Sequence, residues 1–282
     1  MELEKILPKN GPSIDEVKKY TTKYSNDIIV IKCGGSVLLE KNLFNQFIED
    51  ISVINKLGLS VVVVHGGGKN IKKKLDEHNL KSVFIDGLRV TDEKTIKIVE
   101  EALLELNFEI LSEISNHHAN SVSISPKKNN VIRVTPDRKE LGFVGTPTEI
   151  KKDTILEIIN EKKIPLIVPM GIGEDNNIYN INADVAAGAI AKELKARRLL
   201  LITDVEGVLD KSKNLISEIN SAMANEMLEN KTIAGGMIPK IKTCLDAVNN
   251  GVTGVVIVDG RKQHSILFEI FSDKGAGTLI RK

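Results

Sequence analysis

The feature of this sequence that most constrains its fold is a set of short, uninterrupted apolar runs separated by helical patterns. Residues 28–31 and 61–64 show no alternation of polar and apolar side chains. A strand with one wet face alternates, so these runs indicate strands that are covered on both faces. Helical patterns follow them at residues 44–57 and through Leu75. We therefore expect an α/β fold, a three-layer αβα sandwich with a central, mainly parallel sheet and right-handed crossovers.

The alternation of expected strands and helices is interrupted in the middle of the chain and then resumes. A long helix is expected from residue 91 or 92 to about 117, because apolar residues recur there at helical spacing. The segments 121–125, 131–135 and 141–150 are short, β-rich and broken by turn residues, which predicts an antiparallel ribbon appended to the sheet. Helices are then expected at 154–161, 184–195 and 238–249, strands at 166–169, 199–203 and 255–258, and a last helix and strand near the end.

The most turn-rich stretch, residues 171–177, is our expected boundary between two lobes of one chain. We expect an N-terminal extension at 1–26, an N-lobe at 27–175 and a C-lobe at 176–282. The extension should contain an amphipathic helix, because Ser13 and Glu16 form a capping-box signature ahead of an apolar stripe. That helix would pack on its own subunit or pair with the same helix of a neighbour, and the sequence leaves both possibilities open.

Charge and cysteine content exclude several classes of function. The chain has 39 basic and 38 acidic side chains, so it has no global field that would hold nucleic acid or an anionic membrane. Cys33 and Cys244 show neither C-x-x-C spacing nor histidine partners, which favours free thiols over a disulfide framework or a zinc site. No segment approaches the roughly 18 apolar residues of a membrane span. We expect a protein of the reducing cytoplasm.

Three glycine-rich turns follow expected strands, and the first carries a lysine. Lys32 ends a buried strand just before Gly34 and Gly35. A polyphosphate over the strand end would pair with the ammonium, and the glycines would let backbone N–H groups approach its oxygens. The alternative is a lysine that merely extends its amine to solvent. No P-loop pattern occurs, and the glycines near residue 275 precede a strand pattern, which excludes a dinucleotide fingerprint.

The other two turns place further candidates at the same edge of the sheet. His65 precedes Gly66, Gly67 and Gly68, and we expect it to be a structural, hydrogen-bonded histidine rather than a catalytic base. The third turn opens the helix that carries Lys240 one turn inside. Ligands of open α/β sheets bind at the carboxyl ends of the strands. Asp184 begins an alanine-rich helix, where capping and the helix dipole alone would explain it.

Six motifs occur in one order along the chain. They are Lys-Cys-Gly-Gly at 32–35, His-Gly-Gly-Gly at 65–68, Gly-Leu-Arg-Val-Thr at 87–91, Gly-Phe-Val-Gly at 142–145, Asn-Ile-Asn-Ala-Asp at 180–184 and the turn with its lysine at 235–240. Together they resemble the amino-acid kinase family, over about residues 28–280. The motif at 87–91 is similar to the branch of the family that acts on N-acetyl-L-glutamate. The resemblance implies the amino-acid kinase fold and phosphorylation of the γ-carboxylate of N-acetyl-L-glutamate by ATP with Mg²⁺, in arginine biosynthesis, without a tightly bound, protein-ligated metal.

The resemblance also implies a role for each candidate residue. Lys32 and Lys240 would stabilise charge on the transferred phosphoryl group, and Asp184 would orient both lysines. The nucleotide and its phosphates would lie against three glycines of the first and third turns, which are Gly34, Gly35 and Gly236. The acylated amino acid would contact four residues, which are Gly67, Gly68, Arg89 and Asn180, with Arg89 binding its α-carboxylate. Arginine suits that role because its planar fork binds a carboxylate bidentately.

Other functions remain open at this point. A kinase for an N-blocked aminoadipate would differ by one methylene in the acceptor, which is worth only about 1 to 3 kcal/mol in a pocket. A non-catalytic amino-acid sensor could share the fold, although it would not require two lysines and an orienting carboxylate. The C-terminal segment and the N-terminal helix are similar to arginine-inhibited, hexameric members, so L-arginine is an expected inhibitor and a homodimer or hexamer the expected assembly. Whether a PII-type signalling protein binds is left open.

Overall fold

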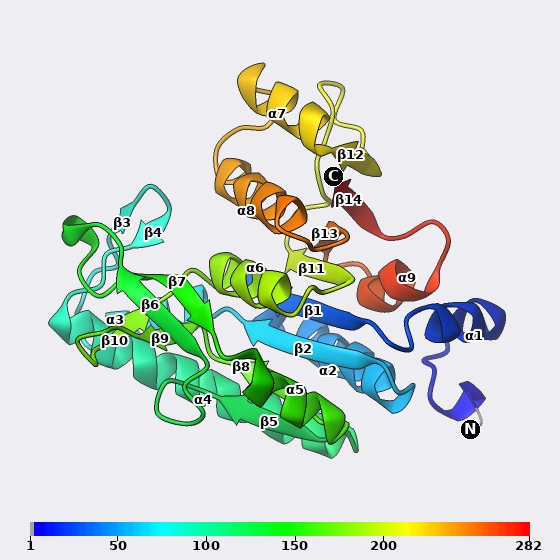
Figure 1. Cartoon of the computed structure of the whole chain (residues 1–282), viewed down its shortest axis with the longest axis horizontal. Helices are drawn as coiled ribbons and strands as arrows, with labels where there is room; N and C mark the ends of the chain where they lie inside the picture. Colours follow the sequence, from blue (N-terminus) through cyan, green and yellow to red (C-terminus); the bar gives the residue numbers. More distant parts are fainter. Residues whose placement is uncertain (1–2) are drawn as a thin grey trace.

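A computed structural model describes residues 3–282, which are arranged as helices on both sides of one large sheet (Figure 1). The sheet has eight strands in the order β12-β14-β13-β11-β1-β2-β8-β5. Their bounds are β1 Ile28–Cys33, β2 Ser60–His65, β5 Ser121–Ile124, β8 Ile164–Ile167, β11 Arg198–Thr203, β12 Glu218–Asn220, β13 Val255–Asp259 and β14 Gly277–Arg281. Within the described residues, β13 and β14 are the one antiparallel pair in this sheet. The expected mainly parallel α/β sandwich is confirmed.

Two helical layers cover the faces of the sheet, as the uninterrupted apolar strands require. One layer contains α2 (Lys41–Lys56), α4 (Glu93–Asn116) and α9 (Ser265–Phe271), with α1 (Ile14–Lys23) packed against α9. The other contains α5 (Lys152–Asn160), α6 (Ala183–Glu193) and α8 (Met237–Asn249) (Figure 1). Within the run 61–64, Val61 and Val63 pack into the first layer, whereas Val62 and Val64 pack into the second. Each buried valine contributes about 1.5 to 3 kcal/mol, so both faces of the strand must be covered.

Smaller elements surround the end of the sheet where β1 and β2 terminate. They are α3 (Gly68–Glu77), the hairpin of β3 (Phe84–Ile85) and β4 (Leu88–Arg89), and a second sheet in the order β10-β9-β6-β7. The second sheet consists of β6 Ile132–Pro136, β7 Gly145–Ile150, β9 Met170–Ile172 and β10 Ile178–Asn180. The short 3₁₀ helices η1 (Leu3–Lys5), η2 (Gly35–Leu38) and η3 (Lys139–Leu141) and the helix α7 (Ser221–Glu229) complete the described elements.

The expected three-segment antiparallel ribbon is wrong in its first segment. Residues 121–124 form β5, which joins the edge of the central sheet parallel to β8. The long helix α4 leads directly into β5, and a helix that returns along a sheet favours parallel addition of the next strand. The other two segments, β6 and β7, do pair antiparallel, but β7 begins only at Gly145 because residues 139–141 form η3.

The N-terminal helix begins where the sequence predicts. The Ser13 side chain accepts a hydrogen bond from the Glu16 N–H, and the Glu16 carboxylate accepts from the Ser13 N–H, which completes the capping box. On the facing side of α1, the Lys19 amine lies 2.6 Å from a carboxylate oxygen of Asp273, just after α9. The helix therefore packs on its own chain, and its pairing with the same helix of a neighbour stays a prediction.

The proposed lobe boundary coincides with a turn. Residues 173–177 connect β9 to β10, and the central sheet contains strands from both sides of this point. The division into an extension at 1–26 and lobes at 27–175 and 176–282 stays a prediction. None of the helices within residues 3–282 combines the length and apolarity needed to span a bilayer.

Candidate active site

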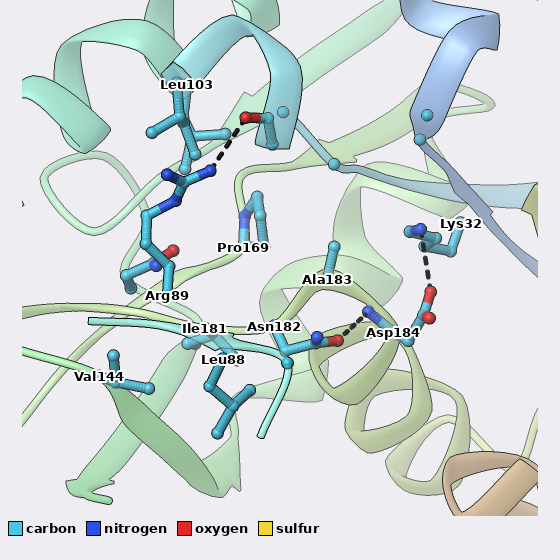
Figure 2. A pocket seen from close by; sticks show the side chains of 18 of the residues that line it. Lys32, Leu88, Arg89, Leu103, Val144, Pro169, Ile181, Asn182, Ala183 and Asp184 are labelled. Carbon is cyan, nitrogen blue, oxygen red and sulfur yellow. Dashed lines mark hydrogen bonds and ion pairs between the residues drawn. The ribbon is translucent and has the colours of Figure 1, made fainter. Parts of the chain in front are cut away.

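The carboxyl ends of β1 and β2 open onto a cavity of about 200 Å³ that brings most of the predicted residues together (Figure 2). Eight of the ten candidates line it, and they are Lys32, Gly34, Gly35, Gly67, Gly68, Arg89, Asn180 and Asp184. Lys240 joins the group through its contact with Asp184. Gly236 precedes α8 and is not among the lining residues. The motifs that are far apart in the sequence thus meet at one edge of the sheet.

Three charged side chains from three elements form one cluster. The Lys32 amine, at the end of β1, lies 2.9 Å from Asp184 Oδ1, and the Lys240 amine, in the second turn of α8, lies 2.6 Å from Asp184 Oδ2. Each of the three side chains is only 13% to 16% exposed. Burial raises the pKa of Asp184, but the two lysines outweigh it and hold that pKa far below its usual range. Two ammonium groups therefore share one carboxylate, and the cluster carries a surplus positive charge facing the cavity.

A neighbouring residue frees Asp184 for this contact. Asn182 is the N-cap of α6, and its Oδ1 accepts hydrogen bonds from the N–H groups of Asp184 and Val185 at 2.9 and 3.3 Å. The capping explanation of Asp184 is therefore wrong, because Asn182 supplies the cap. The Asp184 carboxylate points to Lys32 (Figure 2) and also pairs with Lys240. The residue two positions before Asp184 is itself a preferred N-cap type, which was the signal for this arrangement.

Three glycines of the first two turns, Gly34, Gly35 and Gly67, lie where a side chain would meet neighbouring atoms or strain the backbone. A Cβ atom on Gly34 would lie 2.8 Å from the Lys32 amine, and one on Gly67 would collide with Leu103 of α4. Gly35 has φ +67°, a conformation that favours glycine. With no side chains here, an anionic ligand could approach the backbone closely, which is a common arrangement for anion binding.

Arg89 lies on the opposite side of the cavity from Lys32 (Figure 2). It is 7% exposed, its Nη2 donates to the Gly68 carbonyl at 2.9 Å and its Nη1 donates to Ser82 Oγ. The guanidinium carbon also lies 4.7 Å from the centre of the Phe84 ring. Among residues 3–282, no carboxylate forms an ion pair with Arg89. A buried guanidinium without a counterion favours an anionic ligand in this cavity.

Asn180 links its own motif to the motif that contains Arg89 and to the motif that contains Phe143. Its Nδ2 lies 3.4 Å from Thr91 Oγ1, and its N–H donates to the Phe143 carbonyl at 2.9 Å. The Phe143 N–H donates in turn to the Thr91 carbonyl at 2.7 Å. Backbone hydrogen bonds thus join the motifs at 87–91, 142–145 and 180–184 into one wall of the cavity.

Sequence reasoning missed three residues that shape the site. Ser82 and Phe84 hold the Arg89 guanidinium, and Asn182 orients the start of α6. Ser82 and Phe84 belong to no recognisable motif, so only their contacts with Arg89 reveal them. His65 is completely buried and hydrogen-bonded, in agreement with its expected structural character.

Comparison with known proteins agrees with this geometry. The sequence profile of the amino acid kinase family matches residues 27–259. The chain is 57% identical to the acetylglutamate kinase of Pelagibacter ubique, and the match covers 100% of this chain and 98% of that protein.

Two solved structures of the N-acetylglutamate synthase from Neisseria gonorrhoeae share the fold. In one, the synthase is complexed with coenzyme A and N-acetyl-glutamate; its TM-score is 0.86 at 22% identity, covering 95% of this chain and 62% of that one. In the other, it is complexed with coenzyme A and L-arginine; its TM-score is 0.82 at 21% identity, covering 95% of this chain and 64% of that one. Because the family profile matches most of its length and a relative matches throughout, the chain belongs to the amino acid kinase family.

Proposed function

We propose that this chain transfers the γ-phosphoryl group of ATP to the side-chain carboxylate of N-acetyl-L-glutamate, a step of arginine biosynthesis. One observation carries the proposal: the Lys32–Asp184–Lys240 cluster and Arg89 lie at the same cavity. Arg89 has no carboxylate partner among the described residues. A phosphoryl donor needs the first group, and an amino-acid acceptor with a free α-carboxylate needs the second. The 57% identity to a protein named acetylglutamate kinase supports the same acceptor.

The reaction requires alignment and charge neutralisation more than proton transfer. A side-chain carboxylate oxygen of the acceptor attacks the γ-phosphorus, a new O–P bond forms, and the bond to the bridging oxygen of ADP breaks. Lys32 and Lys240 would neutralise the charge that spreads over the transferred oxygens, while Asp184 keeps both amines in place. The acceptor carboxylate, with a reference pKa of about 4.3, is already ionised at neutral pH, so no general base is needed.

The remaining residues would bind the two substrates on either side of this cluster. Arg89 would bind the α-carboxylate, and Asn180 together with the N–H groups of Gly67 and Gly68 would contact the rest of the acylated amino acid. Gly34 and Gly35 would line the track of the ATP phosphates. We place Gly236 at the nucleotide, because it begins the helix that carries Lys240.

Mg²⁺ would accompany ATP and be bound mainly by phosphate oxygens and water, where it neutralises charge. One side chain at the phosphate track fits this group: a Cβ atom on Gly35 would lie 3.5 Å from Asp204 Oδ2. Asp204 therefore offers an oxygen ligand, directly or through water. We also propose a cytoplasmic location, which the use of ATP and the buried, free thiols of Cys33 and Cys244 support.

The function is tested by trapping the acyl phosphate with hydroxylamine. The assay uses MgATP with N-acetyl-L-glutamate, glutamate, aspartate or an N-blocked aminoadipate, and we expect N-acetyl-L-glutamate to be strongly preferred. The Arg89→Lys variant should raise the KM for the acceptor about 10- to 100-fold with a smaller change in kcat, because a bidentate contact is lost. Preference for the aminoadipate would reassign the pocket, and absence of turnover with every acceptor would favour the sensor.

We further propose that L-arginine inhibits the enzyme from a second cavity of about 330 Å³ between α1 and the segment after α9. Glu269 lies in this cavity with its carboxylate accepting a hydrogen bond from the Ala276 N–H at 2.7 Å, and Lys23 and Lys274 line the same space. The carboxylate would bind a guanidinium, and the lysines an α-carboxylate. Glu269→Gln should abolish inhibition by arginine while leaving turnover without arginine unchanged. Wild-type activity that stays unchanged up to millimolar arginine would contradict this proposal.

We propose a homodimer built on the N-lobe, with a hexamer as the larger alternative. Strand β5 lies at an edge of the central sheet, and Phe108 on the adjacent helix α4 is 74% exposed. A large exposed aromatic beside an open sheet edge is suited to contact with a second copy. Light scattering should give the mass of a dimer or hexamer for the wild type and a smaller assembly for Phe108→Asp. A monomeric wild type would contradict the proposal.

A further inference from the structure

The imidazole of His65 lies at the end of β2, directly before the glycine turn that lines the cavity. It is completely buried, and both ring nitrogens are hydrogen-bonded. Nδ1 lies 2.8 Å from the Gly66 carbonyl oxygen, and Nε2 lies 3.1 Å from Asn107 Nδ2, which belongs to α4. The ring therefore joins the turn to α4. His65 is not among the residues that line the cavity, and within this turn the lining begins at Gly66.

These contacts define the tautomer of His65. A carbonyl oxygen can only accept, so Nδ1 must carry the proton, and an amide nitrogen can only donate, so Nε2 must be the acceptor. Asn107 is held in this orientation because its Nδ2 also faces the Leu166 carbonyl at 3.5 Å; a flipped amide would place two oxygens together. Burial lowers the pKa of His65 to about 4, so the ring is neutral at physiological pH. Asn107 thus keeps the Nδ1 proton directed at Gly66.

The bond to Gly66 determines where the next N–H points. In a trans peptide the C=O and the following N–H lie in one plane and point in opposite directions. With the Gly66 carbonyl directed at His65, the Gly67 N–H is directed away from it, and Gly67 lines the cavity. This N–H has no hydrogen-bond acceptor within residues 3–282. A Cβ atom on Gly67 would meet Leu103 and Leu106 of α4, so the turn packs closely against this helix.

The same turn is held against the phosphate track. The Gly66 N–H donates to the Cys33 carbonyl at 2.6 Å, and a Cβ atom on Gly66 would lie 3.4 Å from the Gly34 Cα. The Gly68 carbonyl accepts from Arg89. The neighbours of the Gly66–Gly67 peptide are bound on both sides. Within the described residues, the Gly66 carbonyl has one hydrogen-bond partner, the His65 ring, which orients the peptide.

We propose that His65 is a positioning residue for the phosphoryl acceptor: through its Nδ1–H it orients the Gly66–Gly67 peptide so that the Gly67 N–H binds the acylated amino acid, and Asn107 maintains the tautomer that makes this possible. The inference rests on the proposed function, since the acceptor bound at Gly67 is the one proposed above. It assigns His65 no contact with substrate.

Two substitutions separate this role from packing. In His65→Asn the amide N–H occupies the position of Nδ1 and can still donate to Gly66. In His65→Gln the amide lies near the position of Nε2, retains contact with Asn107 and fills more of the buried volume, but loses the bond to Gly66. We expect kcat/KM for N-acetyl-L-glutamate to fall about 10- to 100-fold in His65→Gln and much less in His65→Asn. The KM for ATP should stay unchanged in both.

Thermal unfolding of the same variants should give the reverse order. Because asparagine leaves the larger cavity, His65→Asn should have the lower Tm. A packing role alone makes activity follow stability, so an activity of His65→Gln equal to or above that of His65→Asn overturns the proposal. The exposed His78, changed to Asn and to Gln, is the matched control and should leave both quantities unchanged. Turnover of the wild type in the same assay tests the proposed function separately.

A further measurement needs no substitution at residue 65, so it can be made even if such variants do not fold. Ring ¹⁵N spectra of the wild-type protein should show His65 as the neutral Nδ1–H tautomer, and a neutral Nε2–H tautomer overturns the proposal. Asn107→Leu removes the donor to Nε2 while keeping the side-chain volume. It should give a mixture of tautomers together with a lower kcat/KM for the acceptor, and an unchanged kcat/KM with altered tautomers contradicts the assigned role.

Discussion

Two carboxylates with little exposure to solvent have pKa values that are shifted in opposite directions. One is Asp184 in the cavity, and the other is Asp50 next to α9. The Asp184 side chain is 16% exposed and lies between the amines of Lys32 and Lys240, whose attraction lowers its pKa far below the ordinary value in spite of burial. Asp50 is 1% exposed and faces a single partner, His264, whose Nδ1 lies 2.7 Å away. Burial raises the pKa of Asp50 to about 6. The number of permanent cations, rather than burial itself, decides the direction of the shift.

The two sites accordingly depend on pH in opposite ways. The pKa of Asp184 is lowered on folding, so its contribution to stability is present above its ordinary pKa of 3.8 and is lost as the pH falls. The hydrogen bond to Asp50 raises the pKa of His264, so the contribution of the His264 shift is fully present below pH 6.5 and is lost as the pH rises through the folded pKa of His264. The raised pKa of Asp50 acts in the same direction between pH 3.8 and about 6.

The largest expected effect tests the cluster at Asp184. Lys240→Ala should lower kcat by about 10³-fold, because it removes one of two cations at the transferred phosphoryl group. Folding should persist, since Lys32 still pairs with Asp184. Steady-state kinetics and thermal unfolding check both statements, with the exposed Lys242 of the same helix changed to alanine as the control. Full activity of Lys240→Ala would show that the proposed mechanism is wrong.

A smaller effect, on stability alone, is expected at Asp50. Asp50→Asn removes the charge but keeps an oxygen that can accept from His264, so the free energy of unfolding should fall by about 2 kcal/mol at pH 6 and by less at pH 9. Turnover should not change, because Asp50 belongs to α2 and faces the start of α9, away from the cavity. Urea unfolding at the two pH values provides the measurement. A loss that is greater at pH 9 would reverse the sign argued here.

The smallest effect is expected from His264→Asn. His264 has φ +50°, a left-handed conformation that asparagine tolerates, and the new amide can still donate to Asp50. The variant lacks a titrating ring, so it should lose about 1 kcal/mol of stability at pH 6 and almost none at pH 9. Equal losses at both values would mean that His264 is uncharged in the wild-type protein at pH 6, which would weaken the contrast with Asp184.

Local signals predicted much of this structure. The apolar run 61–64 indicated a strand covered on both faces, and Ser13 with Glu16 marked the start of α1. The turns around Gly34 and Gly67 were recognisable because glycine is required where atoms approach closely. Sequence reasoning failed where a segment was short or depended on its neighbours: α7 and the β3–β4 hairpin were missed, and β5 was assigned to the wrong sheet.

The sequence alone determined the alternation of strands and helices, the order of the motifs and the identities of Lys32, Arg89 and Lys240 as the cations of interest. The alternation, Lys32 and Lys240 follow from side-chain type, periodicity and turn chemistry within a few residues, whereas the motif order and Arg89 were recognised through the family resemblance. Only the tertiary structure decided that Asn182 caps α6, that Asp184 reaches two lysines, and that Asn107 sets the tautomer of His65. These are pairings between elements distant in the chain, and a carboxylate or an imidazole acquires its charge state from the partners that folding brings within hydrogen-bond distance.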